Sequence, residues 1–484
     1  MKKIIKYLVC FLGVAGITAC NNLELFPPDQ LGTGTFWKTE RDIQMGVAGV
    51  YAQLKGNPID WNRYKLDDIT DNGYAQYVWD GYSPIQDGNI EPSTGGTISG
   101  LYTTGYRGVA SCNIFLKNFP SAIANAKISE NQASVYEAEV RFLRALFYFE
   151  MVQRYGDIPL YKEALNTVEE SKVKQSPASE VYAFIHEDLD FAIRYLPDVA
   201  YSTGHAVKGS AQALKVRAAL FQNDWNMVET ITREIITSGK YRLADTYQSL
   251  FIKREGQKNN PEIMFSVTYA NPDYRTDAEQ YFYYWQSGGP LDNLIQCYDP
   301  NDVRFKEWYV QMEIGSNSFI NPFDDAAIVG STSKTGWMLL KHMDKYNPST
   351  YQQTDYTFRT ENDIILLRYA DVCLMYIEAM VEKGGGNTTD ALALQCMNDI
   401  RQRAEITVLS SISRNELRLE RRRELAYEGL RHFDLIRWKT AKEVMSTLVT
   451  PQGPCRFEDR YYLWPFPQSE MDINPNLDQK PGYQ

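Results

Sequence analysis

Two stretches of the chain place aromatic side chains beside carboxylate and amide side chains. The first, residues 67–82, contributes Asp67, Asp71, Asn72, Tyr77 and Trp79. The second, residues 281–296, contributes Tyr281, Tyr283 and Trp285. Aromatic rings stack on apolar faces, and carboxylates and amides exchange hydrogen bonds with hydroxyl groups. Sugars present both kinds of surface, so we predict that these residues bind a glycan, with Trp79 and Trp285 as the principal contacts.

The spacing within the second stretch predicts how it presents its rings. Tyr281, Tyr283 and Trp285 alternate with other residues, and a period of two places such side chains on one side of a β-strand. The alternative for each aromatic residue is that it packs beneath its own loop, and the sequence leaves this open.

Acidic residues in the same loops raise the question of catalysis. Asp67, Asp68 and Asp71, or the pair Asp324 and Asp325, would supply the two carboxylates of a glycoside hydrolase. Acidic loop clusters are more commonly solvated or bind Ca²⁺. No G-x-S-x-G motif or P-loop occurs, and the four histidines lack the spacing of metal ligands. We therefore expect a protein that is not an enzyme and needs no cofactor, and leave a structural Ca²⁺ open.

The composition supports a binding protein that does not bind nucleic acid. Aromatic residues make up 13% of the 484 residues, with 33 Tyr and 9 Trp, which favours ring stacking as well as core packing. The formal net charge of −11 argues against nucleic acid as a partner, because phosphate binding needs a basic surface.

The N-terminus predicts export and lipidation. Three lysines precede an apolar run at residues 7–17 that is too short to span a membrane. The run ends in Ile17-Thr18-Ala19-Cys20, which resembles a bacterial lipobox. We expect residues 1–19 to be a signal peptide, Cys20 to carry lipid that anchors the protein in a membrane, and residues 20–35 to be a tether. The alternative is an ordinary secretory signal with an incidental cysteine.

The remaining cysteines give no disulfide framework. After Cys10 and Cys20, an odd number is left with no C-x-x-C spacing: Cys112, Cys297, Cys373, Cys396 and Cys455. Cys373 and Cys396 fall within apolar helical patterns, which indicates small buried side chains. An oxidising compartment would permit a bridge, so the disulfide state stays open.

Most of the chain has helical periodicity, and these helices must position the loops. In residues 138–155 apolar positions recur at steps of three and four around most of the helix, which predicts a helix at the centre of the packing. Further helices are expected at residues 39–54, 106–117, 179–195, 209–238, 368–404 and 412–440. Of these, 209–238 and 368–404 each read as a helix pair with the length of a tetratricopeptide repeat.

Two long segments lack this periodicity. Residues 57–105 and 241–367 are rich in Gly, Pro, Asn, Asp and Tyr, with short β-like runs only at 262–269 and 357–367. Loops of this length are usually functional. We therefore predict a mainly α fold in which tetratricopeptide-like helical repeats form a scaffold and a large loop-rich, irregular half carries the binding site. The prolines after Cys455 predict an extended strap, and the alternating Glu and Arg of residues 416–424 are interpreted as a solvated helix face.

An ordered set of motifs across nearly the whole chain resembles the SusD/RagB family of outer-membrane lipoproteins of Bacteroidota. The motifs include FWKTERDIQMGVAGVY at 36–51, AEVRFLRALFYFEMVQRYGDIPL at 138–160, LLRYADVCLMYIEA at 366–379, ERRRELAYEGLRHFDLIRW at 420–438 and YLWPFPQSEMDINPNLDQKPGY at 462–483. Lys480 and residues 430–432 depart from the usual pattern, and both lie in expected scaffold.

The resemblance implies a function and a division of the chain. It implies a single SusD-like domain over residues 36–484, with an N-terminal part at 36–240 and a C-terminal part at 241–484. It also implies a lipoprotein at the cell surface that binds oligosaccharide or polysaccharide without chemistry and passes it to a SusC-like TonB-dependent transporter. Arg368, in the family's RYAD block, is a further candidate for the glycan groove; its alternative is an ion pair with a carboxylate such as Asp371.

Three other functions remain open from the sequence. Some relatives of the family serve peptide uptake, so the ligand could be a peptide. A repeat-protein adaptor would bind only protein, and a glycoside hydrolase would release reducing sugar. The sequence does not name the glycan or its linkage.

Overall fold

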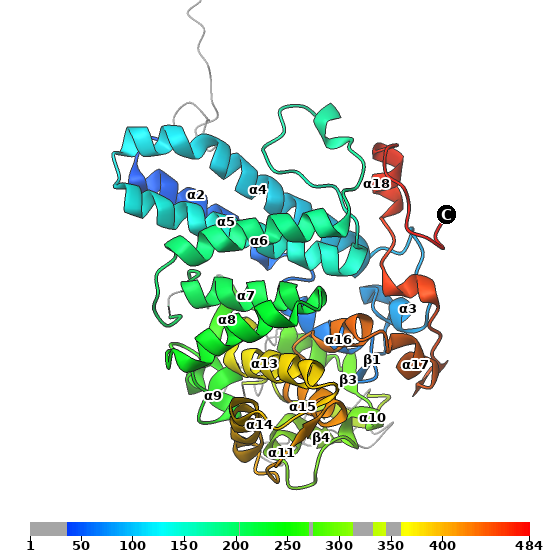
Figure 1. Ribbon diagram of the computed structural model, residues 1–484. Coiled ribbons are helices and arrows are strands. Elements are labelled where there is room, and N and C mark those ends of the chain that lie inside the picture. The colour runs from blue at the N-terminus through cyan, green and yellow to red at the C-terminus, as the bar shows by residue number, and fades with distance from the viewer. Residues whose placement is uncertain (1–35, 203, 271–273, 313–332, 345–359) are drawn as a thin grey trace, which may run out of the picture.

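The computed structural model describes residues 36–202, 204–270, 274–312, 333–344 and 360–484. The predicted signal peptide, Cys20, the tether, and the pair Asp324 and Asp325 lie outside these residues. Within the described ranges, no helix is both long enough and apolar enough to cross a membrane. Two groups of helices and a region of short strands and loops make up the described part of the chain (Figure 1).

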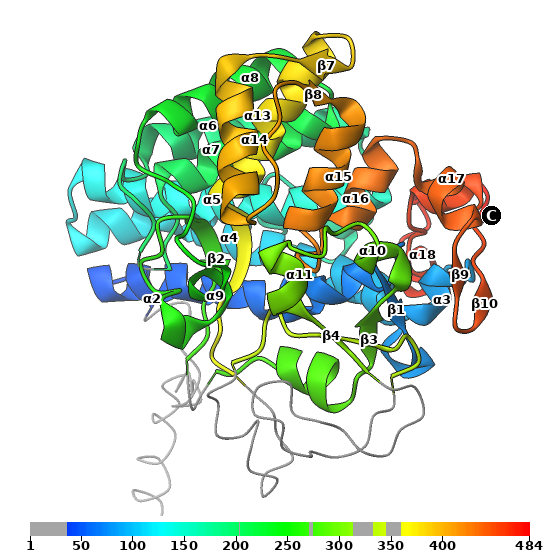
Figure 2. The same cartoon turned by 90° about the horizontal axis from the view of Figure 1, so that it is seen from below.

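The first group of helices confirms the predicted centre of the packing. It comprises α2 (Glu40–Ala52), α4 (Thr97–Ala126), α5 (Glu130–Tyr155) and α6 (Ala178–Tyr195), which lie side by side (Figures 1 and 2). Thr39 begins α2 with a capping box, in which its hydroxyl and the Asp42 carboxylate each accept a backbone N–H. Nearly every residue of the C-terminal half of α5 is buried, as its all-round apolar pattern predicts. Gly156 ends α5 with a φ of +66°.

Two glycines let α4 and α5 approach closely. A β-carbon at Gly105 would lie 2.4 Å from the sulfur of Met151, and one at Gly108 would lie 2.6 Å from the ring of Phe147. Glycine lowers the stability of a helix, and here the close packing of the two helices offsets that cost.

The second group contains both predicted helix pairs. These are α7 (Lys208–Phe221) with α8 (Trp225–Thr237), and α13 (Tyr369–Lys383) with α14 (Ala391–Arg403). Helix α8 packs against α13, so the two pairs, far apart in the sequence, form one continuous helical scaffold (Figure 1). Stacked helix pairs of this kind are the arrangement that a tetratricopeptide-like repeat predicts.

The strands are short and, in the described ranges, form two-stranded antiparallel ladders. The ladders pair β1 (Gly73–Ala75) with β3 (Gly288–Pro290), β2 (Ile263–Val267) with β6 (Ile364–Arg368), β4 (Tyr309–Gln311) with β5 (Trp337–Leu339), β7 (Asn387–Thr388) with β8 (Ile412–Ser413), and β9 (Val449–Thr450) with β10 (Gly453–Pro454). The β2–β6 ladder confirms the predicted run at 262–269 and the described part of the run at 357–367. The remaining helices are short: α3 (Ser83–Gln86), α9 (Tyr247–Phe251), α10 (Asp292–Ile295), α11 (Val303–Trp308), α15 (Arg414–Glu424), α16 (Arg431–Arg437), α17 (Ala441–Ser446) and α18 (Gln468–Ile473).

Three predicted boundaries were wrong. Helix α4 begins at Thr97, well before the predicted residue 106, because Thr97, Ile98 and Leu101 are buried in the core and extend the helix. The predicted helix at 412–440 is divided into α15 and α16. Between them Tyr427 has a φ of +57° and Gly429 a φ of +72°, which a helix cannot include. The C-terminal strap is not extended throughout, since α18 forms directly after Pro467.

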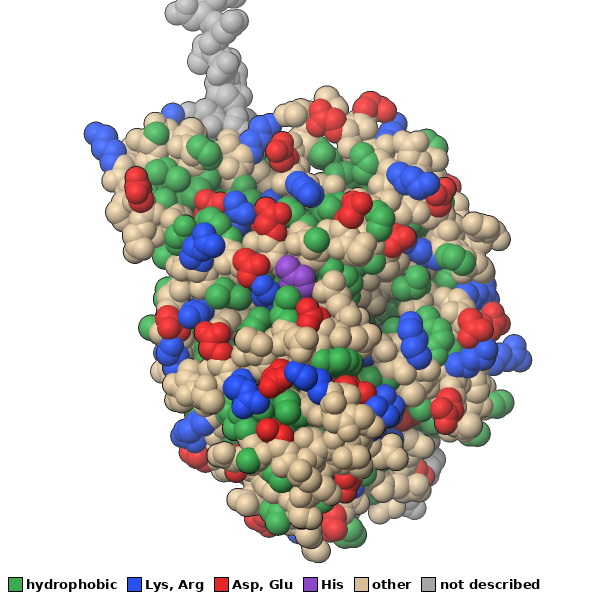
Figure 3. Space-filling view, in the orientation of Figure 1, with side chains coloured by type: hydrophobic (Ala, Val, Ile, Leu, Met, Phe, Trp, Pro, Cys, Tyr) green, Lys and Arg blue, Asp and Glu red, His purple; other side chains and the backbone are tan. Residues whose placement is uncertain are grey.

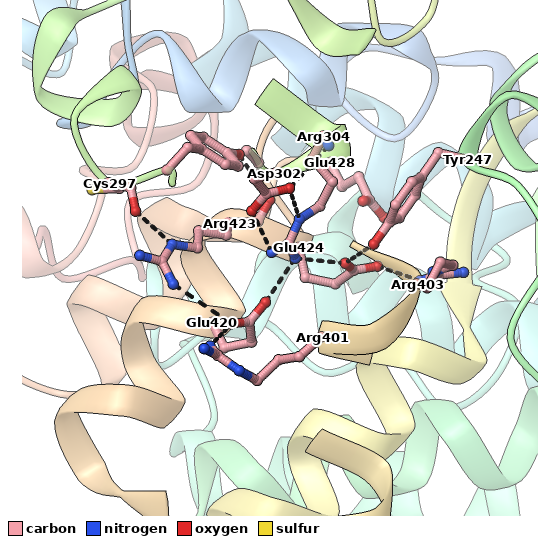
Figure 4. A network of polar contacts seen from close by, with 12 residues as sticks. Tyr247, Cys297, Asp302, Arg304, Arg401, Arg403, Glu420, Arg423, Glu424 and Glu428 are labelled. Atoms are coloured by element: carbon pink, nitrogen blue, oxygen red, sulfur yellow. Dashed lines mark hydrogen bonds and ion pairs between the residues drawn. The ribbon is translucent and has the colours of Figure 1, made fainter. Parts of the chain in front are cut away.

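The interpretation of residues 416–424 as a solvated face was also wrong, because Glu420, Arg421 and Glu424 of α15 are buried. Figure 4 shows Glu424 at the centre of a polar network in which its carboxylate meets Arg304, Arg403 and Tyr247. Glu420 and Glu424 have no solvent exposure, and Arg304 lies 2.7 Å from one and 2.9 Å from the other. Buried charges need partners of opposite charge, and here some partners come from distant segments. The residue pattern within α15 cannot reveal such partners.

Candidate functional site

Trp79 and Trp285, the two residues predicted to make the principal contacts, lie next to each other on the surface. Their ring centroids are 5.7 Å apart and the rings are perpendicular, with an interplanar angle of 89°. Trp79 is 61% exposed and Trp285 is 43% exposed. Tyr77 stacks on Trp79 with its centroid 6.3 Å away and an angle of 26°. The three rings form a continuous aromatic surface, which we call the aromatic platform.

The β1–β3 ladder brings the platform together. The antiparallel register pairs Ala75 with Gly288 and Gly73 with Pro290, so the end of β1 lies beside the start of β3. A further bond, from the Gln76 N–H to the Ser287 carbonyl at 2.8 Å, continues the pairing toward the tryptophans. Trp79 follows β1 and Trp285 precedes β3, and for that reason both emerge at the same end of the ladder.

Tight turns on both sides hold the two rings at the surface. Trp79 lies in a 3₁₀ turn at Val78–Asp80, which Gly81 closes with a φ of +80°. A β-carbon on Gly81 would lie 3.0 Å from the Cα of Gly96, so this position favours glycine in both conformation and space. After Trp285, Gln286 has a φ of +48°, and its side-chain oxygen accepts the Ser333 N–H at 2.9 Å.

The second aromatic stretch was predicted as a strand, and this was wrong. Residues Gln280–Tyr284 form a turn of π-helix, in which the Trp285 N–H donates to the Gln280 carbonyl at 2.9 Å. A helical turn points successive side chains in different directions, so Tyr281 and Tyr283 do not share a side with Trp285. Both tyrosines are buried, and only Trp285 reaches the surface among the three.

Tyr281 and Tyr283 pack in the interior of the protein instead. Tyr281 packs near Trp61, with centroids 6.0 Å apart, and the Lys65 ammonium lies 4.1 Å from its ring centroid. Tyr283 belongs to an apolar cluster with Met338, Leu340 and Met343. Trp61 is an aromatic residue near the site that the sequence analysis did not single out.

Val78 is a second omission, and it belongs to the platform's surface. Its side chain is exposed between Tyr77 and Trp79. An exposed valine next to the exposed ring of Trp79 and the half-buried ring of Tyr77 widens the apolar area that a ligand would cover. Its position between two aromatic residues in the sequence was the available signal.

The predicted polar partners of the first stretch, Asp67, Asp71 and Asn72, are buried. Asp67 accepts hydrogen bonds from the Asn72 amide at 2.7 Å and from the backbone N–H groups of Tyr427 and Gly429 at 2.9 Å each. Burial raises the pKa of Asp67 to about 6, against the effect of these donors. Neither Asp67 nor Asn72 has measurable exposure, so in this structure they fix the loop and do not face a ligand.

Asp71 and Asn72 are bound to arginines of the C-terminal segment. Arg431 meets both carboxylate oxygens of Asp71 at 2.8 Å, and Arg422 donates to Asn72 Oδ1 at 2.7 Å. Burial acts to raise the pKa of Asp71, but the charges of Arg422 and Arg431 outweigh it and lower that pKa. Bidentate pairs of this type fix geometry as well as charge. Asp67 and Asp71, two of the carboxylates considered for a hydrolase, are thus bound within the scaffold, and the pair Asp324 and Asp325 lies outside the described residues.

Arg368 does not point into a glycan groove. It is buried, and its guanidinium meets Glu428 at 2.7 Å, Glu262 at 2.7 Å and Glu424 at 2.8 Å. Arg368 does form ion pairs, as the alternative interpretation stated, but Asp371 is not one of its partners. Asp371 is bound instead by Arg217 and Arg421, at 2.7 and 2.9 Å.

The remaining chemistry of the described residues does not indicate a metal or redox site. Among them, no group of three or more His, Cys, Asp and Glu side chains is arranged to hold a metal ion. The five described cysteines are free thiols, and Cys373 and Cys396 are buried as their apolar surroundings predict. The face in Figure 3 shows acidic and basic side chains interspersed, without a continuous basic field.

Comparison with known proteins places the chain among one group of relatives. The model of the SusD family matches residues 219–483, and a model described as starch-binding and associating with the outer membrane matches residues 23–220. The chain is 26% identical to SusD-like protein P2 of Formosa agariphila over the full length of both chains.

Solved structures of similar proteins share the fold. A SusD-like protein from Bacteroides fragilis superposes with a TM-score of 0.78 at 27% identity, covering 95% of this chain and all of that one. A laminarin-binding SusD-like protein superposes with a TM-score of 0.76 at 23% identity, covering 92% of this chain and all of that one. These likenesses confirm the mainly helical fold with tetratricopeptide-like pairs.

Proposed function

The chain belongs to the SusD family, and from that premise we propose that it is a cell-surface lipoprotein that captures a glycan on the aromatic platform of Tyr77, Trp79 and Trp285. It then delivers the oligosaccharide or polysaccharide to a SusC-like TonB-dependent transporter. The protein acts by binding alone and carries out no reaction on the glycan.

The observation that supports glycan capture is the exposed, perpendicular contact of Trp79 and Trp285. Adjacent exposed apolar side chains mark binding surfaces, and the apolar face of a sugar can stack on such a ring. A sugar face that covers such a ring adds to the free energy of binding through dispersion and through removal of apolar surface from water.

Two observations support the location and the partner. The lipobox ending in Cys20 predicts an anchor at the N-terminus, and the family model over residues 23–220 is described as associating with the outer membrane. A lipoprotein that only captures glycan at the cell surface needs a transporter for import. The resemblance supplies the class of that transporter.

The experiment that tests the proposal is calorimetry of the full-length protein in detergent against a panel of soluble polysaccharides. The panel includes laminarin, because one structural neighbour carries that ligand in its name. We expect one polymer to bind, and Trp79→Ala and Trp285→Ala each to weaken it by about tenfold or more, equal to about 1.4 kcal/mol. Tyr195→Ala, which removes an exposed ring at the end of α6, serves as the matched control and leaves affinity unchanged.

Three results would decide against this function. Binding that persists in both tryptophan variants would remove the platform as the site. Binding of peptides and of no polymer would favour peptide uptake, and capture of the transporter alone would favour a protein adaptor. If the protein released reducing sugar, and mutation of one carboxylate abolished that release, the protein would be a glycoside hydrolase.

A further inference from the structure

A second concave site is lined by residues of α4, of the connection that follows α5 and of α18, and by none of the platform. Figure 1 shows where these three segments lie. Its volume is about 400 Å³, within the range of about 300–1,000 Å³ typical of pockets for small molecules. The walls combine three tyrosines with aliphatic side chains. The tyrosines are Tyr102, Tyr106 and Tyr161, and the exposed aliphatic residues at the rim are Ile114, Leu165 and Ile473.

Two of the three tyrosine hydroxyl groups are engaged within the protein, and the three rings lie against one another. Tyr106 lies between the other two, with ring centroids 4.6 Å from Tyr102 and 5.5 Å from Tyr161. The Tyr106 hydroxyl donates to the carbonyl of Pro159 at 2.9 Å, and the Tyr161 hydroxyl donates to that of Ser171 at 2.6 Å. Hydroxyl groups engaged in this way are unavailable to the hydroxyls of a sugar.

The amides that line the pocket are also engaged. The Asn113 side chain donates to the carbonyls of Tyr161 and Glu163 and accepts from Arg144 at 2.8 Å. The Asn474 side chain donates to a backbone carbonyl and accepts a backbone N–H. A polyhydroxylated ligand would therefore find few partners here.

Two carboxylates are different, because they have no cationic partner. In the described part of the chain, neither Glu470 nor Glu163 has an ion pair or a side-chain hydrogen bond, and both line the pocket. Glu470 is half-buried, and burial raises the pKa of its carboxyl. Glu470 lines the same pocket as Tyr102 and Tyr161, and after burial its charge is the next cause of the raised pKa values of these two tyrosines.

We propose that this pocket binds a small organic amine, with its protonated amino group between Glu470 and the tyrosine rings and its apolar body against the aliphatic wall. A cation over an aromatic face gains from the ring quadrupole, and a carboxylate in an apolar pocket gains most from an opposite charge. The proposal is independent of glycan binding, because none of the lining residues belongs to the platform.

The test uses the full-length protein and 2-phenylethylammonium as the probe, with 2-phenylethanol as a neutral probe of the same shape. Calorimetry and saturation-transfer NMR report binding. We expect the ammonium to bind at least about tenfold more tightly than the alcohol.

Three variants separate a specific site from a general attraction to acidic surface. Glu470→Gln removes the charge and should lower the affinity for the ammonium by about tenfold. Asp472→Asn, an exposed residue on the same helix whose carboxylate lies outside the lining, should leave it unchanged. Ala110→Phe adds bulk at an exposed lining position of α4 and should abolish binding without touching the core.

Several outcomes would overturn the proposal. These are equal binding of amine and alcohol, unchanged affinity in Glu470→Gln, an equal loss in Asp472→Asn, or no binding of the ammonium up to about 10 mM, beyond which affinity is negligible. Tighter binding of a capped lysine than of the free amine would assign the pocket to a protein side chain instead. Binding of a neutral oligosaccharide that Ala110→Phe removes would make it a second glycan site.

Discussion

Gly288 lies so close to Asp68 that no side chain fits between them. A β-carbon at Gly288 would be 2.0 Å from Oδ2 of Asp68 and 2.8 Å from a ring carbon of Tyr281. Gly288 pairs with Ala75 in the ladder that brings Trp79 and Trp285 together. The contact between a glycine and a buried carboxylate therefore underlies the geometry of the aromatic platform.

Gly288→Ala should disturb that geometry. The added methyl group must displace Asp68 or Tyr281, which we expect to cost about 1–3 kcal/mol of the free energy of unfolding, as overpacking does elsewhere. Because β3 shifts, Trp285 should move relative to Trp79, and glycan affinity should fall. Urea denaturation and glycan calorimetry measure the two effects.

The matched control for this change is Gly49→Ala in α2. No atom lies within 4 Å of the position of its β-carbon. Alanine in a helix should stabilise the protein by about 0.5–1 kcal/mol and leave glycan binding unaffected. If Gly288→Ala kept both its stability and its affinity, the ladder would not be what positions the platform.

Glu424→Gln should be among the most destabilising single changes in the scaffold. Burial acts to raise the pKa of Glu424, but the charges of Arg403, Arg368 and Arg304 outweigh it and hold that pKa well below its ordinary value. Removing the carboxylate charge leaves three buried guanidinium groups short of a partner, at an expected cost of about 3–5 kcal/mol. Chemical denaturation monitored by circular dichroism gives the value.

Glu382→Gln is the comparison for that experiment. Glu382 pairs with Arg414 at 2.7 Å in a pair that is partly exposed. Solvated pairs contribute only about 0–1 kcal/mol, so the two substitutions should differ by several-fold in their effect on the free energy of unfolding. Equal effects would mean that the network around Glu424 is no more sensitive than an ordinary surface pair.

His205 should make stability depend on pH in a predictable direction. Its Nδ1 is 2.6 Å from the Glu139 carboxylate, which also accepts the Tyr51 hydroxyl at 2.7 Å. The bond to Glu139 raises the pKa of His205 above its ordinary value, although burial opposes this. A raised folded-state pKa gives stability that is fully present below pH about 6.5 and is lost as the pH rises through the raised value.

The measurement compares the free energy of unfolding at pH 6 and pH 9 for the natural protein and His205→Gln. Between pH 6 and pH 9 the free energy of unfolding of the natural protein should fall by up to about 1 kcal/mol more than that of the variant. The difference is small because His205 is exposed. Glu139→Gln should remove the same increment. If the free energy of unfolding fell equally in the natural protein and in both variants, His205 would not be the cause of the pH dependence.

The helical scaffold was largely predictable from the sequence because it depends on local patterns. The apolar spacing in residues 138–155, the Thr39 cap and the turn at Gly384–Gly386 each act within one or two turns of chain. Errors occurred where distant contacts overrode local preference, as at the start of α4, where burial of Ile98 and Leu101 extends the helix.

The same distinction separates the predictions for the site. That Trp79 and Trp285 are large rings in irregular segments followed from the sequence, and this was enough to nominate them. The sequence did not show which of their neighbours reach the surface, because a π-helical turn is present in place of the predicted strand and Tyr281 and Tyr283 are buried. Local alternation cannot distinguish a strand from a short helical turn when tertiary packing decides between them.

The sequence by itself determined most of the helices and the family resemblance, and it predicts the lipobox at Cys20, since each depends on the order of neighbouring residues. Only the tertiary structure decided which charges are buried and which rings meet. Asp67, Asp71 and Arg368 became part of the scaffold because their partners come from the C-terminal segment or from Glu262, just before β2, far along the chain. Trp79 and Trp285 became one surface because antiparallel pairing of β1 with β3 fixes the distance between them, and that pairing is a property of the folded chain alone.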